Sequence, residues 1–251
     1  DALVPLRGAL ERRRYDWSGY AGALAQTFAA LRPHAPADLP LFAIVPELNP
    51  PFSAAVLTAL QSAGFILTGA ALSPEGDLAQ FTWQPAEAGA SPGTVLEGMQ
   101  VHLRERGEPA DFATTYLAGL LPACAPAAPA DTPPLQSVQT ALENAFHNSA
   151  VFYHYKTSEN AALDTGLWGL ADSAGSDLPL ADRMERFVVT WLQKTPEFMQ
   201  SALEADLWAE FPGLLTPPQD LLRACLESYA EPTGAPGAWR SGVNDQRRQG
   251  W

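Results

Sequence analysis

The stretch LQSVQTALENAFHNSAVFYHYKTSENAALDTGLWGLA, residues 135–171, decides how the middle of the chain folds. Apolar residues recur at helical spacing over 135–147, and an aromatic segment with strand alternation follows at 151–156. The segment 166–171 returns as a second strand, so residues 157–165 are expected at the tip of a hairpin. Two helices precede this stretch, at 94–106 and 111–121. Three helices followed by a hairpin are the order of a winged helix.

The first of these helices carries its own start signal. Thr94 is followed three residues later by Glu97, the pattern of a capping box. Gly107-Glu108-Pro109 then ends the helix. The region 94–178 is therefore expected to form a winged-helix-like unit.

Residues 179–251 repeat the scheme. Helices are expected at 180–193 and 197–210, and a turn at 211–215 leads to a helix that Thr216 caps and that ends at Tyr229. Residues 238–240 are expected to form a short strand. This region is interpreted as a second winged-helix-like helical unit.

The region 1–85 reads as helix, strand, helix, strand, turn and strand. The expected elements are helices at 18–31 and 53–63 and strands at 39–45, 65–72 and 78–83. The first strand is continuously apolar, as in strands buried on both faces, and Ser53 is the expected cap of the second helix. Since a doubly wound domain usually needs about five or more parallel strands, this region is expected to be the distal part of a Rossmann-like sheet. The fold class is α/β followed by mainly α, with linkers at 84–93, 123–134 and 232–237.

Charge and composition exclude several classes of protein. The 251 residues carry 28 acidic and 15 basic side chains, a net charge of −13, which disfavours both a simple basic nucleic-acid module and binding to an anionic membrane. No apolar run reaches the length of about 18 residues that a transmembrane helix needs. Two distant cysteines without CxxC or HExxH spacing argue against a structural metal and fit a reducing cytoplasm. The chain begins at Asp1, which suggests a piece of a larger protein.

One tetrapeptide has the spelling of a catalytic loop. Asn49-Pro50-Pro51-Phe52 follows a strand, and an Asn/Asp-Pro-Pro-aromatic sequence in that position is typical of methyltransferases that act on exocyclic amines. The side-chain oxygen and a backbone carbonyl would accept hydrogen bonds from the amine, and the ring would stack on an extruded base. A Gly-rich cofactor loop should accompany it, and none precedes it. The competing interpretation is a Pro-Pro turn that starts a helix.

Two groups of residues are candidates for contacts with nucleic acid. Arg12, Arg13 and Arg14 form the only basic cluster, and Tyr153, His154 and Lys156 lie on the expected hairpin. The competing interpretations are a solvated segment end and a packed, half-buried strand. The region 94–178 has ten acidic and three basic residues, a local charge of −7, so docking of a protein partner is an alternative to DNA.

Several segments together resemble the carboxy-terminal portion of large bacterial DNA methyltransferases that methylate the amino group of adenine or cytosine. The residues that carry the resemblance are FAALRP at 28–33, LFAIVP at 41–46, LTALQSAGF at 57–65, RGEP at 106–109, PLADRME at 179–185 and FPGLLTP at 211–217. The resemblance implies a parent enzyme that transfers a methyl group from S-adenosylmethionine to a DNA base. Its cofactor and catalytic loops would precede residue 1, so this chain alone is expected to bind no cofactor.

The resulting hypothesis is a fragment, not catalytic alone, that completes the methyltransferase fold and positions DNA or a partner. Its expected partners are DNA, the remainder of the methyltransferase domain or another protein. Two alternatives stay open. One is a compact, divergent methyltransferase that uses Asn49 to Phe52 directly, and the other is a non-enzymatic winged-helix adaptor that binds protein or DNA.

Overall fold

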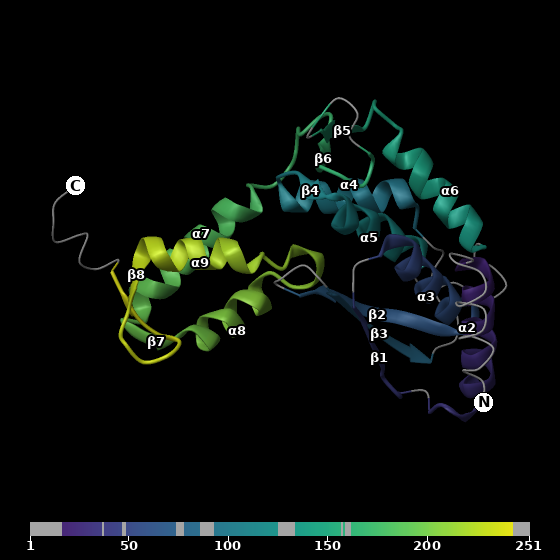
Figure 1. Ribbon diagram of the computed structural model, residues 1–251, viewed down its shortest axis with the longest axis horizontal. Helices are drawn as coiled ribbons and strands as arrows, with labels where there is room; N and C mark the ends of the chain where they lie inside the picture. The colour runs from purple at the N-terminus through teal and green to yellow at the C-terminus, as the bar shows by residue number, and fades with distance from the viewer. Residues whose placement is uncertain are drawn as a thin grey trace.

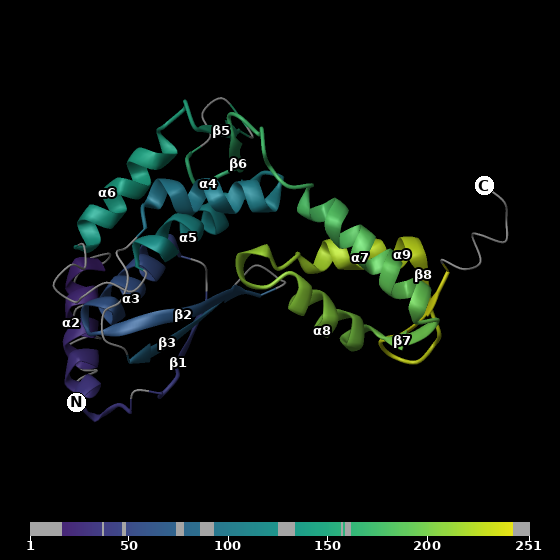
Figure 2. The same cartoon turned by 180° about the vertical axis from the view of Figure 1, so that it is seen from behind.

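The computed structural model describes residues 17–36, 38–46, 49–73, 78–85, 93–124, 134–156, 158 and 162–242 (Figure 1). Three regions follow one another: a sheet unit (17–85), a second unit (93–178) and a third unit (179–242). The sheet unit and the second unit pack against each other, and the third unit extends to one side of them (Figures 1 and 2). The fold is mixed α/β, with three small antiparallel sheets among the described residues.

The sheet unit has one sheet covered by helices. Its elements are α2 (Trp17–Leu31), a 3-10 turn η1 (Arg32–His34), β1 (Leu41–Pro46), α3 (Pro50–Ser62), β2 (Phe65–Leu72) and β3 (Leu78–Pro85). The strand order is β1-β3-β2, and β3 is antiparallel to both neighbours. β1 and β2 therefore run in the same direction on either side of β3, and α3 connects them.

The burial of β1 differs from the expectation. The strand was expected to be buried on both faces, but Phe42 and Ile44 are 65% and 66% exposed while Val45 is buried. The alternation arises because α2 and α3 cover one face of the sheet, and β1 lies at its edge (Figure 1). The expectation of burial on both faces is therefore wrong for the described residues.

The start of α3 also differs. Ser53 was expected to cap this helix, but Asn49 caps it, and Ser53 is buried one turn inside. Pro50 and Pro51 occupy the first helical positions, where their missing N–H groups cost nothing. The helix therefore begins three residues earlier than its apolar pattern predicts.

The described residues of the second unit form three α-helices and a three-stranded sheet. Its elements are α4 (Val95–Arg106), β4 (Ala110–Asp111), α5 (Phe112–Ala123), α6 (Leu135–Phe146), β5 (Phe152–Tyr155) and β6 (Leu167–Leu170), and the strand order is β4-β6-β5. The capping box is confirmed: Thr94 accepts the Glu97 N–H, and the Glu97 carboxylate accepts the Thr94 N–H. The two-residue strand β4 has no counterpart in the sequence analysis.

The third unit repeats the order of the second. Its elements are α7 (Leu180–Lys194), β7 (Glu197–Met199), α8 (Gln200–Glu210), the 3-10 turn η3 (Gly213–Leu215), α9 (Gln219–Tyr229), β8 (Ala230–Pro232) and β9 (Ala238–Ser241). The strand order β7-β9-β8 matches β4-β6-β5, because in both sheets the last strand lies between the first two. Two boundaries differ from the expectation. Residues 197–199 form a strand, and α9 begins after Pro218, since the Thr216 hydroxyl donates to the Gly213 carbonyl instead of capping it.

Two separate cores stabilise the described chain. The first is shared by the sheet unit and the second unit, with α3 packed on α5 and α6, and includes the buried indoles of Trp83 and Trp168. The second core belongs to the third unit and is built on the buried face of α7. Each core holds one free cysteine, Cys124 in the first and Cys225 in the second. Burial raises the pKa of the Cys124 thiol to about 12 and also raises that of Cys225.

Two matched core substitutions test this division. Leu192 and Leu142 are fully buried, one in each core. Leu192→Ala is expected to cost about 2–5 kcal/mol, because it leaves a cavity in the core of the third unit. Hydrogen exchange should then accelerate over 180–241 and stay slow in α3 and α5. Leu142→Ala should give the reverse pattern, and equal acceleration everywhere for both variants would contradict two separate cores.

Candidate functional site

A cavity of about 780 Å³ opens where the sheet unit meets the second unit. Its walls come from the start of α3, the start of α5, the middle of α6 and the residues before β6. Such a volume is typical of ligand pockets. The lining residues are Trp17, Asn49, Pro50, Pro51, Asp111, Phe112, Ala113, Tyr116, Gln139, Glu143, Leu163, Asp164 and Gly166.

Asn49, Pro50 and Pro51 of the expected catalytic tetrapeptide line this cavity, and Phe52 does not. The Asn49 side-chain oxygen accepts the Phe52 N–H at 3.1 Å, as a helix cap. The Phe52 ring packs between Trp17 and Tyr20, with centroids 5.6 Å from each. In this arrangement the Asn49 oxygen accepts a helix-cap hydrogen bond, and the Phe52 ring packs within its own unit. The geometry is that of the Pro-Pro turn that was the competing interpretation.

The same junction offers little to a cofactor. A helix N-terminus binds anionic groups through its free N–H groups. In α3, Pro50 and Pro51 have no N–H, the Phe52 N–H bonds to the Asn49 side chain, and the Ser53 N–H bonds to the Asn49 carbonyl. The described start of α3 therefore does not fit the Gly-rich cofactor loop of a Rossmann-like domain.

The electrostatics of the cavity are negative. Asp111, Glu143 and Asp164 supply carboxylates, and the described residues of its lining include no Lys or Arg. Asp111 also caps α5, because its two carboxylate oxygens accept the N–H and the hydroxyl of Thr114, each at 2.8 Å. Burial, with smaller contributions from Cys124 and Glu143, raises the pKa of Tyr116 above its ordinary value. The cavity can therefore accept hydrogen bonds from N–H donors and disfavours a phosphate.

The hairpin of the second unit separates its candidate residues into two groups. Tyr153 and Lys156 are exposed, as a contact surface requires. His154 instead stacks on Trp168 with centroids 4.1 Å apart, and its Nε2 lies 2.6 Å from the Thr165 carbonyl oxygen. Tyr155, which was not among the predicted site residues, is 47% exposed and contacts Tyr153 at 4.7 Å between centroids. The alternation of β5 places both tyrosines on one face.

The other predicted contacts cannot be placed. Arg12, Arg13 and Arg14 lie outside the described residues.

No described group of three or more His, Cys, Asp or Glu side chains has the geometry to hold a metal ion. Within the same part of the chain, every helix falls short of the length and hydropathy needed to cross a bilayer.

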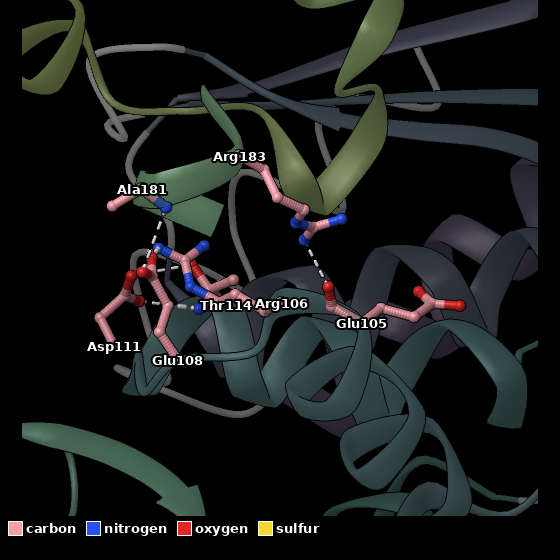
Figure 3. A network of polar contacts seen from close by, with 7 residues as sticks. All are labelled: Glu105, Arg106, Glu108, Asp111, Thr114, Ala181 and Arg183. Atoms are coloured by element: carbon pink, nitrogen blue, oxygen red, sulfur yellow. Dashed lines mark hydrogen bonds and ion pairs between the residues drawn. The ribbon is translucent and has the colours of Figure 1, made fainter. Parts of the chain in front are cut away.

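A polar joint fixes the third unit to the end of α4 (Figure 3). Glu108 forms an ion pair with Arg106, 3.1 Å between Nη2 and Oε1, and its other oxygen accepts the Ala181 N–H at the start of α7. The Arg183 guanidinium donates to the Glu105 carbonyl. Carboxylates are favourable at helix N-termini, so Glu108 both caps α7 and links two units.

Gly107 makes this joint possible. Its φ of +70° is left-handed, and a Cβ there would lie 2.4 Å from the Asp177 carbonyl oxygen. The Asp177 N–H in turn donates to the Arg104 carbonyl at 2.9 Å. Only glycine allows the chain after 176 to pass so close to the end of α4.

Sequence reasoning missed most of the cavity. Asp111 and Glu143 carry a cap pattern and a helical surface pattern, which point to ordinary local roles. Trp17 begins an ordinary apolar helix. No local signal places these residues together, because they meet only through packing of the sheet unit on the second unit.

A buried histidine beside the joint predicts acid sensitivity. His102 is 6% exposed, and burial, assisted by Arg106 and opposed by Asp111, lowers its pKa from 6.5 to about 4. Between pH 6.5 and 4, His102 is protonated in the unfolded chain and neutral in the folded chain. The stability that is present above pH 6.5 is therefore lost as the pH falls toward 4. Between pH 7 and 5 the loss is about 2 kcal/mol. His102→Leu should remove it in urea unfolding, whereas exposed His147→Leu should not. An unchanged pH dependence in His102→Leu would contradict this assignment.

The comparisons with known proteins identify no relative. No protein-family model matches the chain, and neither the curated proteins nor the solved structures that were searched contain a significant match.

Proposed function

We propose that this chain is the carboxy-terminal portion of a DNA methyltransferase that uses S-adenosylmethionine. In this proposal it completes the catalytic sheet and positions DNA or a partner, and the cofactor binds to the rest of the enzyme. The second and third units act as two winged-helix modules. The resemblance of six sequence segments suggests the family, and one structural observation carries the proposal.

That observation is the topology of the sheet unit. β1 and β2 are parallel, joined by α3, and β3 returns between them as an antiparallel strand. A parallel pair with a helical crossover is the building unit of Rossmann-like sheets. Three strands are too few for a whole domain of this kind, so the unit suits the distal end of a longer sheet.

The order of the two other units supports the winged-helix part of the proposal. Each has the order helix, strand, two helices and hairpin, and in each the last strand pairs with both others. In a winged helix the third helix and the hairpin contact DNA, here α6 with the β5–β6 hairpin, and α9 with the β8–β9 hairpin. Exposed Tyr153 and Lys156 are candidates for such a contact.

The geometry of Asn49 favours a fragment over a compact enzyme. Its oxygen is used as a cap, and the neighbouring N–H groups are bonded or absent. A free-standing methyltransferase would need a cofactor cradle, and the described start of α3 does not supply one.

Binding of labelled S-adenosylmethionine tests this assignment. The 251-residue chain is expected to show no saturable binding and no transfer of methyl groups to DNA. Should it do both, Asn49→Ala and Asn49→Asp would identify the active loop. Asn49→Ala removes the cap and costs about 1 kcal/mol, whereas Asp retains a capping oxygen. Methyl transfer that a folded Asn49→Ala variant loses and that Asn49→Asp retains would replace the fragment proposal with the compact enzyme.

A DNA mobility shift tests the positioning role. We expect a weak shift at low salt that disappears as salt rises, because Lys156 is one of only three basic residues in the region 94–178. Lys156→Gln should lower the slope of log affinity against log salt by about one, and Tyr153→Ala should weaken binding with the slope unchanged. Exposed Lys194→Gln in α7 is the control. No shift even at the lowest salt would contradict the role in DNA positioning.

A protein-binding adaptor is the second candidate, and a specific surface favours it. Tyr153, Tyr155 and Leu167 are each between 46% and 56% exposed and share one face of the β5–β6 hairpin. The unit around them is acidic, which suits a basic protein surface better than phosphate. If the folded chain does not bind DNA in the mobility-shift experiment, this second candidate is favoured.

A further inference from the structure

β1 has an unpaired edge. Within the described residues it pairs only with β3, and no described strand bonds to the row of N–H and C=O groups on its other side. Native proteins protect such edges with charges, prolines or bulges. β1 has the sequence LFAIVP, without a charge, and its only proline is at the end. At the opposite edge of the same sheet, η3 of the third unit lies against β2.

The outer face of β1 is also bare. Phe42 and Ile44 are more exposed than any other large apolar side chain among the described residues. They lie two residues apart, so they share a face, and their partners across the sheet are Thr82 and Gln80. Two neighbouring apolar side chains at an open edge form a surface that water solvates poorly.

The inner face of β1 is incompletely filled. An apolar cavity of about 240 Å³ lies between α2 and β1. α2 packs along α3, and the cavity separates it from the edge of the sheet. Its lining residues are Tyr20, Leu24, Phe28, Leu41, Phe42, Ala43, Ile44, Val45, Phe52, Val56, Leu60 and Trp83.

We infer that β1 is an internal strand of a larger sheet and that its open edge accepts one further apolar strand. The inference rests on the proposed function, in which that strand belongs to the rest of the methyltransferase domain. Its backbone completes the hydrogen bonds of β1 by β-augmentation. One row of its side chains fills the cavity below α2, and the other row lies beside Phe42 and Ile44.

The composition of β1 supports this occupant. Five consecutive apolar residues, 41–45, are typical of a strand buried on both faces, whereas an antiparallel edge strand alternates with polar residues. The structure exposes two of the five, so the sequence is built for a neighbour that the described residues do not supply. Because neither face carries a charge, the occupant is apolar rather than a basic or acidic peptide.

A strand-forming peptide tests the edge on the intact 251-residue chain. The probe is a capped hexapeptide of alternating isoleucine and threonine, and the control is the same peptide with N-methyl groups on alternate residues, which block pairing. In amide NMR spectra the probe should cause saturable shifts at Leu41 to Val45, and the control should bind at least about tenfold more weakly. Equal binding of both peptides, or no shift at millimolar concentration, overturns the inference.

Two variants distinguish specific binding at this edge from nonspecific binding to exposed apolar side chains. Ile44→Gln should weaken binding of the probe peptide by about tenfold, because it removes an apolar contact. Val101→Gln, at a half-exposed position on α4, should leave binding unchanged. Both positions are exposed, so both variants should fold. An equal loss in the two variants contradicts a specific edge.

Sedimentation separates a second copy from the proposed strand. The chain should be a monomer, and a dimer that Ile44→Gln dissociates would make a second copy the occupant and overturn the inference. The readout involves neither cofactor nor DNA. Strand binding together with methyl transfer by this chain alone would refute the proposed function and leave the open edge intact. If the chain binds neither the strand nor the cofactor, the open edge is refuted and the proposed function is left intact.

Discussion

The contact on which the arrangement of the chain depends is the one between Glu108 and the start of α7. A single carboxylate balances Arg106 with one oxygen and accepts the Ala181 N–H with the other. The left-handed Gly107 brings the chain to this point, and Arg183 closes the contact from the opposite side by donating to the Glu105 carbonyl. The third unit has its own core, so its placement relative to the other units depends on this joint and on the turn η3 against β2. Segments 106–109, 179–185 and 211–217 build these contacts.

Sequence signals within a few residues predicted the helices, because capping and helical periodicity depend on neighbouring residues. The capping box of Thr94 and Glu97 set the start of α4, and helical periodicity placed α6 and α7. The short strands β4, β7 and β8 had no signal, because two or three residues become a strand only when a later strand pairs with them. Asn49 was considered for chemistry and Ser53 for capping, and the structure gives the capping role to Asn49. A cap and a catalytic amide have the same residue type after a strand, so the sequence alone does not separate them.

The candidate site was less predictable than the fold. Alternation predicted the strand β5, but it gave no indication that His154 would stack on Trp168 from the neighbouring strand. The cavity beside Asn49 joins residues more than a hundred positions apart in the chain, from Trp17 to Gly166. Each carboxylate of the cavity, considered alone, fits an ordinary role at the surface or as a helix cap. Only the packing of α3 on α5 and α6 turns them into a shared wall.

The two cysteines give each core a built-in chemical reporter. Cys124 is buried in the core that the sheet unit shares with the second unit, and Cys225 is buried in the core of the third unit. A thiol with a raised pKa that is shielded from solvent reacts with alkylating reagents only when its surroundings open. The rate of modification of each thiol therefore measures how often its own half of the molecule opens. Whether the joint at Glu108 makes the two halves open together can be determined on the unmodified sequence, from the ratio of the two rates.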